Sequence, residues 1–273
     1  MSAPASPDRY RGSASYYSRG RLPYPRGVGE ALAGAVGLCP HSRLLDVGCG
    51  PGRLTFELAD RYDEVVGVDV DAEMLAVAEQ TARERRLHQV VFRHLPAEEI
   101  GPRLGSFDTV TFALSFHWMD QPRVAEAVRS VLRPGGPCVH VYSPSLQGEP
   151  VLGEPAPPYE AVNDLRDRHL GTGWRGRTGR ADPEQAATAM RGAGFEGPDI
   201  VMVPGGDVVT STVDDLVARY LSTASSAPVR FGEPAEAFEG ELRRLLLDAS
   251  PSGGFAERLL DARLDVWRSP GPR

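Results

Sequence analysis

The 273-residue chain contains no lysine, so arginine supplies all 30 of its basic residues against 37 acidic ones. Its net charge is −7, and no block of basic residues is present that could follow a phosphate backbone. No apolar run approaches the roughly 20 residues that span a bilayer, and the N-terminus shows no signal-peptide core. We therefore expect neither nucleic acid nor a membrane as a partner.

Cysteine is also scarce. Cys39, Cys49 and Cys138 are odd in number and have no metal-ligand spacing. This usage predicts reduced thiols in a cytoplasmic protein without a metal site. Cys49 invites a reading as a nucleophile, but its place in a glycine-rich turn favours a small residue that fits the turn. No internal repeat is visible, and the length suits one well-buried domain with an insertion or cap.

The most informative stretch joins a strand, a turn and a helix. Arg43 to Val47 is a short apolar run fit for a strand buried on both faces. It leads into Gly48-Cys49-Gly50-Pro51-Gly52, which is too rich in glycine for a strand or helix interior. Helical periodicity begins at Leu54. This is the first unit of a nucleotide-binding α/β sheet, in which small residues let the backbone approach a ligand.

Two acids indicate which ligand this turn binds. The spacing is G-x-G-x-G rather than the G-x-G-x-x-G of dinucleotide sites, and Asp46 lies two residues before the first glycine. An acid there disfavours a pyrophosphate and suits a ligand with a cationic group. Asp69 ends the next apolar run, where it can accept hydrogen bonds from ribose hydroxyls. The combination favours S-adenosylmethionine over NAD and argues against a dehydrogenase.

These residues belong to a longer resemblance. The chain resembles the class I S-adenosylmethionine-dependent methyltransferases of the small-molecule, type 11 group, over roughly residues 10–145. The segments that carry the likeness are 44–55, 65–75, 95–100, 106–120 and 131–136. The resemblance implies an α/β, Rossmann-like sheet of seven mostly parallel strands flanked by helices, with the last strand antiparallel. It also implies S-adenosylmethionine as cofactor and S-adenosylhomocysteine as product.

The resemblance implies a set of cofactor-binding residues. Asp69 binds the ribose, the Ala97–Glu98 region borders the adenine, and Asp71 caps the helix that follows the second strand. Arg21 of the N-terminal arm would bind the methionyl carboxylate, with Arg19 as an equal alternative. The full predicted set is Tyr17, Arg21, Asp46, Gly48, Gly50, Gly52, Asp69, Val70, Ala97, Glu98, Leu114 and Trp118.

Methyl transfer from a sulfonium asks little covalent chemistry of the protein, which aligns the reactants and excludes water. His117 follows the expected fourth strand, at the carboxyl edge of the sheet, and is the candidate general base. The alternative is that His117 only holds the loop near Trp118, and the sequence leaves both open. Tyr17 is a secondary candidate for proton transfer.

The expected organisation is an N-terminal arm over 1–25, which folds over the site, and a methyltransferase domain over 26–273. Lid insertions are expected at about 144–182 and 210–250. Inside the insertions, helices are predicted at Tyr159–His169, Val213–Leu221 and Ala235–Leu247. After the second insertion, one final strand is predicted over Phe255–Trp267. Other predicted helices are 28–36, 72–79, 121–132 and 183–191, and other strands are 65–69, 90–92, 107–114, 138–142 and 200–203.

The expected activity is methylation of a small organic acceptor, with proximity and His117 as its means. The lysine-free composition is typical of a high-GC bacterial source, where such enzymes serve specialised metabolism. Two rivals stay open: a cyclase or other enzyme that uses the cofactor without methylating, and a non-catalytic S-adenosylmethionine-binding module. A polar, aromatic-lined cavity beside His117 would favour an enzyme. An exchanged N-terminal arm would give a homo-oligomer.

Overall fold

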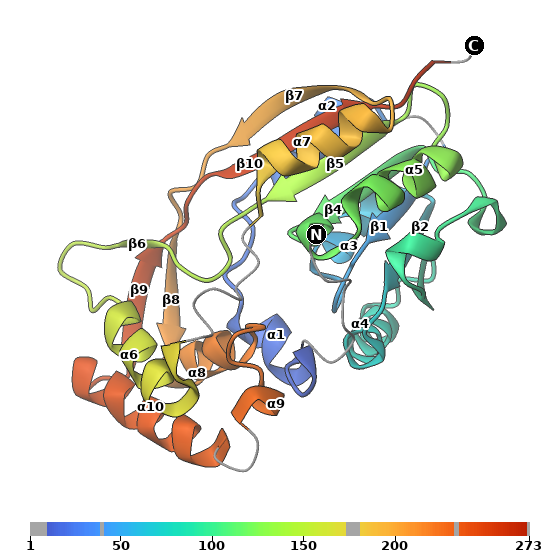
Figure 1. The fold of residues 1–273 in the computed structure, drawn as a ribbon. Helices are drawn as coiled ribbons and strands as arrows, with labels where there is room; N and C mark the ends of the chain where they lie inside the picture. The colour runs from blue at the N-terminus through green and yellow to red at the C-terminus, as the bar shows by residue number, and fades with distance from the viewer. Residues whose placement is uncertain (1–9, 39–40, 173–180, 232–234, 272–273) are drawn as a thin grey trace.

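A computed structural model describes residues 10–38, 41–172, 181–231 and 235–271. Its main sheet has seven strands in the order β3-β2-β1-β4-β5-β10-β7 (Figure 1). The first five of these are parallel, and β10 runs antiparallel to both β5 and β7. The predicted fold class is therefore confirmed. In sheet order the bounds are Val90–His94, Glu64–Asp69, Arg43–Val47, Thr109–Ala113, Pro137–Tyr142, Ala262–Arg268 and Glu196–Val203.

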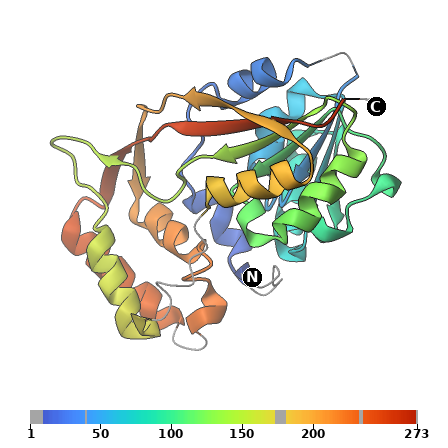
Figure 2. The same ribbon diagram turned by 45° about the horizontal axis from the view of Figure 1, so that its top comes forward.

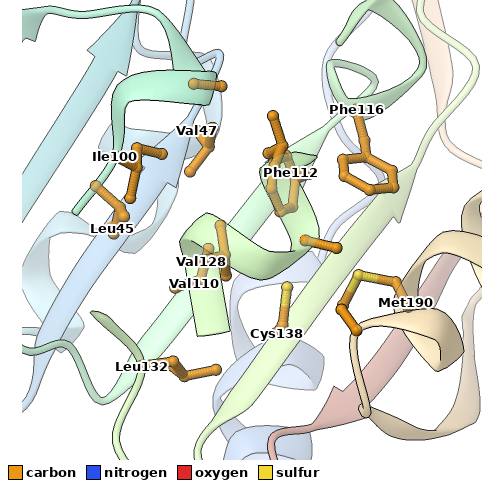
Figure 3. Packing of buried hydrophobic residues seen from close by; sticks show 14 of the residues in the cluster. Leu45, Val47, Ile100, Val110, Phe112, Phe116, Val128, Leu132, Cys138 and Met190 are labelled. Atoms are coloured by element: carbon orange, nitrogen blue, oxygen red, sulfur yellow. The ribbon is translucent and has the colours of Figure 1, made fainter. Parts of the chain in front are cut away.

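Helices cover both faces of this sheet. Leu44 and Leu45 are both fully buried, and because side chains alternate along a strand they belong to clusters on opposite faces. Figure 3 shows Val110 of β4, Val128 of α5 and Met190 of α7 within one cluster. One face carries α2 (Val28–Val36), α3 (Arg53–Leu58) and α4 (Ala72–Arg85), and the other carries α5 (Gln121–Val131) and α7 (Pro183–Gly192).

A second layer of structure, here called the cap, lies beyond the ends of β5, β7 and β10 (Figures 1 and 2). It has its own apolar core and a three-stranded sheet in the order β6-β9-β8. Its strands are β6 (Glu149–Pro150), β8 (Val208–Thr212) and β9 (Gly254–Arg258). Its helices are α1 (Ala14–Gly20), α6 (Tyr159–Leu170), α8 (Val213–Leu221), α9 (Pro228–Phe231) and α10 (Ala235–Ala249).

The prediction of one strand over Phe255–Trp267 is wrong. The segment forms two strands in different sheets: β9 pairs with β6 and β8, whereas β10 pairs with β5 and β7. Between them the chain leaves both sheets, and the Asp261 carboxylate accepts a hydrogen bond of 2.8 Å from the Gly205 N–H. Because Leu260, Ala262 and Leu264 preserve the alternation, the pattern gives no sign of the break.

Part of the N-terminal arm is integral to the cap. The Ser13 hydroxyl donates to the Leu221 carbonyl at 2.9 Å, and Arg219 Nε donates to the Gly20 carbonyl at 3.0 Å. On its other side the arm meets α4, where the Gly12 N–H donates to Glu73 at 3.0 Å. The arm thus connects the cap with the main domain. Of the predicted segments, residues 1–9, Cys39, residues 173–180 of the first insertion and residues 232–234 of the second lie outside the described residues.

Within the described ranges, no helix combines the length and apolar character needed to cross a bilayer. The same part of the chain contains no group of three or more His, Cys, Asp or Glu side chains placed to hold a metal ion.

Candidate functional site

A cavity of about 360 Å³ lies where β1, β2 and β4 end at their carboxyl edges. Ligands of parallel α/β sheets bind at this edge. The arm contributes Tyr10 and Tyr17 to its wall. The cavity is lined by nine of the residues predicted from sequence, which are Tyr17, Gly48, Gly50, Asp69, Val70, Ala97, Glu98, Leu114 and Trp118.

The glycines of the turn have different surroundings. A Cβ on Gly48 (φ +65°) would lie 2.5 Å from the Ser115 Cβ, so this glycine permits close packing between two loops. At Gly50 (φ +55°) nothing lies within 4 Å of such a Cβ, because that side faces the cavity. Gly52 is the N-cap of α3 and does not line the cavity. Of the two glycines that line the cavity, Gly50 is the one with open space at its Cβ position.

Alanine substitutions should separate packing from ligand space. Both φ angles are positive, so Gly48→Ala and Gly50→Ala share a backbone cost of about 1–3 kcal/mol. Gly48→Ala adds the clash with Ser115, worth about 1–3 kcal/mol more. We expect urea denaturation to show the larger loss of unfolding free energy for Gly48→Ala. Equal losses in the two variants would contradict this packing role.

Asp69 is held rigidly at the cavity wall. Its Oδ2 accepts from the Gly50 N–H at 2.7 Å and its Oδ1 from the Asp71 N–H at 2.9 Å. Burial raises the pKa of Asp69, and the two backbone N–H groups oppose that rise. Asp71 caps α4 by accepting from the N–H groups of Glu73 and Met74, as predicted. Each Asp69 oxygen keeps a lone pair for a further donor.

Asp46 does not line the cavity. Its side chain is buried beneath the turn and accepts from the hydroxyls of Thr55, at 2.6 Å, and Thr111, at 2.8 Å. It thereby joins β1 to α3 and β4. Burial raises the pKa of Asp46 to about 6, against the effect of the two hydroxyls. The sequence predicted that Asp46 contacts the ligand, whereas in the structure its carboxylate bonds to Thr55 and Thr111 and stabilises the turn.

This shift predicts a pH dependence. The pKa of Asp46 is about 6 in the folded state and 3.8 in the unfolded chain. The protonated carboxyl therefore adds its full contribution to the free energy of unfolding below pH 3.8, and this contribution is lost as the pH rises through 6. The loss amounts to about 3 kcal/mol. Asp46→Asn should remove it, so the difference in unfolding free energy between variant and wild type should change between pH 4 and 7. Denaturant titrations in that range measure it, and parallel pH profiles would refute it.

The loop after β4 forms the opposite wall. Leu114, in a left-handed conformation (φ +51°), lines the cavity together with Ser115 and Trp118. The Ser115 hydroxyl donates to the Val47 carbonyl at 2.6 Å, which fixes this loop to β1. The Trp118 ring lies 6.4 Å from the Tyr10 ring, between centroids. An aromatic pair from two distant segments thus borders the site.

His117 lies elsewhere. It does not line the larger cavity, but lines a second, smaller one that shares Leu114 and Ser115 with it. Its ring centroid is 4.5 Å from that of Trp118. The structure therefore brings the predicted base next to the site without exposing it to the main cavity.

Arg21 is engaged with the cap rather than the cavity. Its guanidinium donates to the Ser222 carbonyl at 2.7 Å and to the Ser145 hydroxyl at 3.2 Å, and it lies over the Tyr17 ring at 4.4 Å. Arg19, the alternative, pairs with Asp214 and Asp215. The structure thus leaves both arginines outside the cavity lining.

Several lining residues escaped sequence reasoning. Arg123 supplies a cationic side chain, and its signal is its place in the first turn of the helix that follows the β4 loop. Glu99 also reaches the wall. The others are Tyr10, Asp71, Met74, Pro96, Ala113, Ser115 and Met119. The sequence contains no motif that marks these residues as part of a cavity wall.

Cys49 behaves as the turn predicts. Its side chain is buried, and desolvation raises the pKa of its thiol well above the usual range. Because the thiolate is the reactive form, this cysteine is not an activated nucleophile.

Comparison with known proteins agrees with this geometry. Residues 44–136, which hold the glycine turn, Asp69 and the β4 loop, match the family described as Methyltransferase domain. Over these residues the chain is similar to methyltransferase domains.

Part of the chain is also similar to curated proteins of distant organisms. The chain is 34% identical over 126 residues to the probable S-adenosylmethionine-dependent methyltransferase CRG1 of Saccharomyces cerevisiae, covering 45% of this chain and 43% of that protein. It is 40% identical over 120 residues to an uncharacterized methyltransferase of Mycobacterium bovis, covering 44% and 46%. The chain therefore spans less than half the length of these two curated relatives.

The whole fold, cap included, is similar to a solved structure. The 4+2 cyclase SpnF aligns over 100% of both chains with a TM-score of 0.57 and 21% sequence identity. At this identity the likeness concerns the fold alone.

Proposed function

We propose that this protein transfers the methyl group of S-adenosylmethionine to a small organic acceptor. The observation that carries the proposal is the cavity at the carboxyl ends of β1, β2 and β4, with the Asp69 carboxylate fixed at its wall and open space at Gly50. An acidic acceptor of hydrogen bonds next to a glycine that leaves room for a ligand suits a nucleoside with a charged side arm.

The residues present fit this cofactor. In our proposal Asp69 accepts from the ribose hydroxyls, Val70 and the Ala97–Glu98 backbone border the adenine, and Leu114 and Trp118 form the wall. Gly48 and Gly50 bring the backbone close, while Asp46 and Gly52 shape the turn. When bound, the cofactor supplies an electrophilic methyl on sulfur. The chain itself orients the acceptor and excludes water, with Tyr17 covering the cavity.

We assign His117 the role of proton acceptor for substrates that reach the smaller cavity. Leu114 and Ser115 line both cavities, and a substrate group that enters the smaller one would contact His117. The smaller cavity is polar and aromatic, with Phe116, His140 and Tyr142 on its wall. A lining of this kind supports an enzyme over a non-catalytic binding module. The likeness to a cyclase concerns fold and does not favour cyclisation.

In the same proposal, the segments 1–25, 144–182 and 210–250, which contain the arm and the cap, form a lid on the cavity. The proposed setting is bacterial specialised metabolism in the cytoplasm. The lysine-free composition supports the source, and the free Cys49 and Cys138 suit a reducing compartment.

Incubation with S-adenosylmethionine carrying a deuterated methyl, in the presence of a panel of alcohols, phenols, amines and acids, tests the proposal by mass spectrometry. Transfer of the labelled methyl to one class supports it. His117→Ala should lower kcat by about 10²–10⁴-fold if His117 takes the proton, with exposed His88→Ala as control. Binding of S-adenosylhomocysteine without any transfer would point to the non-methylating alternatives.

A further inference from the structure

The smaller cavity can hold a single small chemical group. It measures about 10 Å³, room for roughly one oxygen-sized group. Leu114 and Ser115 line both this cavity and the larger one. A ligand of the main cavity therefore lies next to the smaller cavity.

Two buried polar atoms on its wall lack partners. Among the residues that the structure describes, His140 Nε2 on β5 and Gln121 Oε1 at the start of α5 have no hydrogen-bond partner, although the two residues are only 1% and 5% exposed. Both residues line the smaller cavity. An unsatisfied buried donor or acceptor costs about 1–3 kcal/mol, and most such groups in proteins have a partner. Two of them in one cavity indicate a site for a ligand group.

The two atoms are complementary in kind. The Tyr142 hydroxyl lies 3.5 Å from His140 Nδ1, and we assign it as the donor, which leaves the ring proton on Nε2. Burial lowers the pKa of His140 to about 3, so the ring is neutral at physiological pH. Nε2–H then offers a hydrogen bond, whereas Gln121 Oε1 can only accept one.

We propose that this cavity recognises a hydroxyl group, of an alcohol or a phenol, on the methyl acceptor, an inference that rests on the proposed function. A hydroxyl accepts from His140 Nε2–H and donates to Gln121 Oε1 at once. An ammonium has no lone pair for Nε2–H, and a carboxylate has no proton for Oε1.

The surroundings favour an apolar carrier for that hydroxyl. The His140 ring centroid lies 4.6 Å from that of Phe116 and 5.1 Å from that of Phe112. His140 anchors the hydroxyl and does not deprotonate it, because a neutral, desolvated imidazole ring is a poor base. His140 and Gln121 are thus specificity residues.

Phenol, anisole and fluorobenzene can be titrated into the protein saturated with S-adenosylhomocysteine. Phenol both donates and accepts, anisole only accepts, and fluorobenzene lacks the hydroxyl. We expect phenol to bind wild type at least about tenfold more tightly than the other two. Gln121→Leu removes the side-chain amide, so phenol should lose its advantage over anisole, whereas anisole binding, which does not use the Oε1 acceptor, should stay unchanged. The Asp120 N-cap of α5 stays intact in this variant.

A second measurement needs no variant. With ¹⁵N-labelled histidine, the Nε2 resonance of His140 should shift on addition of phenol and stay in place with fluorobenzene. An unmoved resonance, or equal phenol affinity in wild type and Gln121→Leu, would overturn the hydroxyl site even where S-adenosylhomocysteine binds. Failure of S-adenosylhomocysteine itself to bind would instead overturn the proposed function on which the site rests.

Discussion

Arg219→Met is expected to lower the free energy of unfolding by about 3–5 kcal/mol, because it leaves the Glu257 carboxylate buried without its cation. The two side chains are 3% and 2% exposed and form an ion pair at the centre of the cap. Arg219 also donates to the Ser211 hydroxyl at 2.8 Å, and Glu257 accepts from the Gly148 N–H at 2.9 Å and from the Tyr159 hydroxyl. Five separate segments therefore depend on one pair.

Chemical denaturation measures this loss, and two further variants make it specific. Arg219→Met combined with Glu257→Leu should recover much of the stability, since no unpaired charge remains. Arg243→Ala breaks a solvent-exposed pair with Asp214 and should stay close to wild type. If Arg219→Met and Arg243→Ala had the same free energy of unfolding, the buried ion pair would not stabilise the cap.

Asp69→Ala is expected to weaken S-adenosylhomocysteine binding at least about tenfold, equivalent to 1.4 kcal/mol or more. The substitution removes the carboxylate proposed to accept from the ribose. It also frees the N–H groups of Gly50 and Asp71, which that carboxylate positions. Isothermal titration calorimetry on both proteins gives the two dissociation constants.

Asp63→Ala is the matched control, because Asp63 is an exposed acid at the opposite end of β2. It should bind as wild type does. Thermal unfolding of Asp69→Ala separates a damaged turn from a lost contact. A folded Asp69→Ala with wild-type affinity would remove Asp69 from the proposed cofactor site.

Much of the central fold was predictable because it depends on neighbours in the chain. The strand ending at Val47, the glycine turn and the helix capped by Asp71 are each encoded within a few residues. Side-chain periodicity also located α6 and α8 inside the insertions. The cofactor-binding roles of all the named residues stay predictions until binding is measured.

The site shows where that reasoning ends. The turn predicted Gly48 and Gly50 at a cavity, and both line it. The same pattern could not say that Asp46 would turn to Thr111, which is 65 residues away, or that Arg21 would bond to Ser222, which is 201 residues away. A motif fixes which residue types are near a turn, but not which partners they choose.

The sequence by itself thus determined the strand–turn–helix unit, the acid at the end of β2 and the class of fold, because hydrophobic period and turn chemistry act locally. Only the tertiary structure decided the division of Phe255–Trp267 between two sheets and the placement of His117 on a second cavity. The same holds for the position of His140 and Gln121 on the wall of that cavity. These depend on contacts between segments far apart in the chain, and no local pattern records the free energy of such contacts.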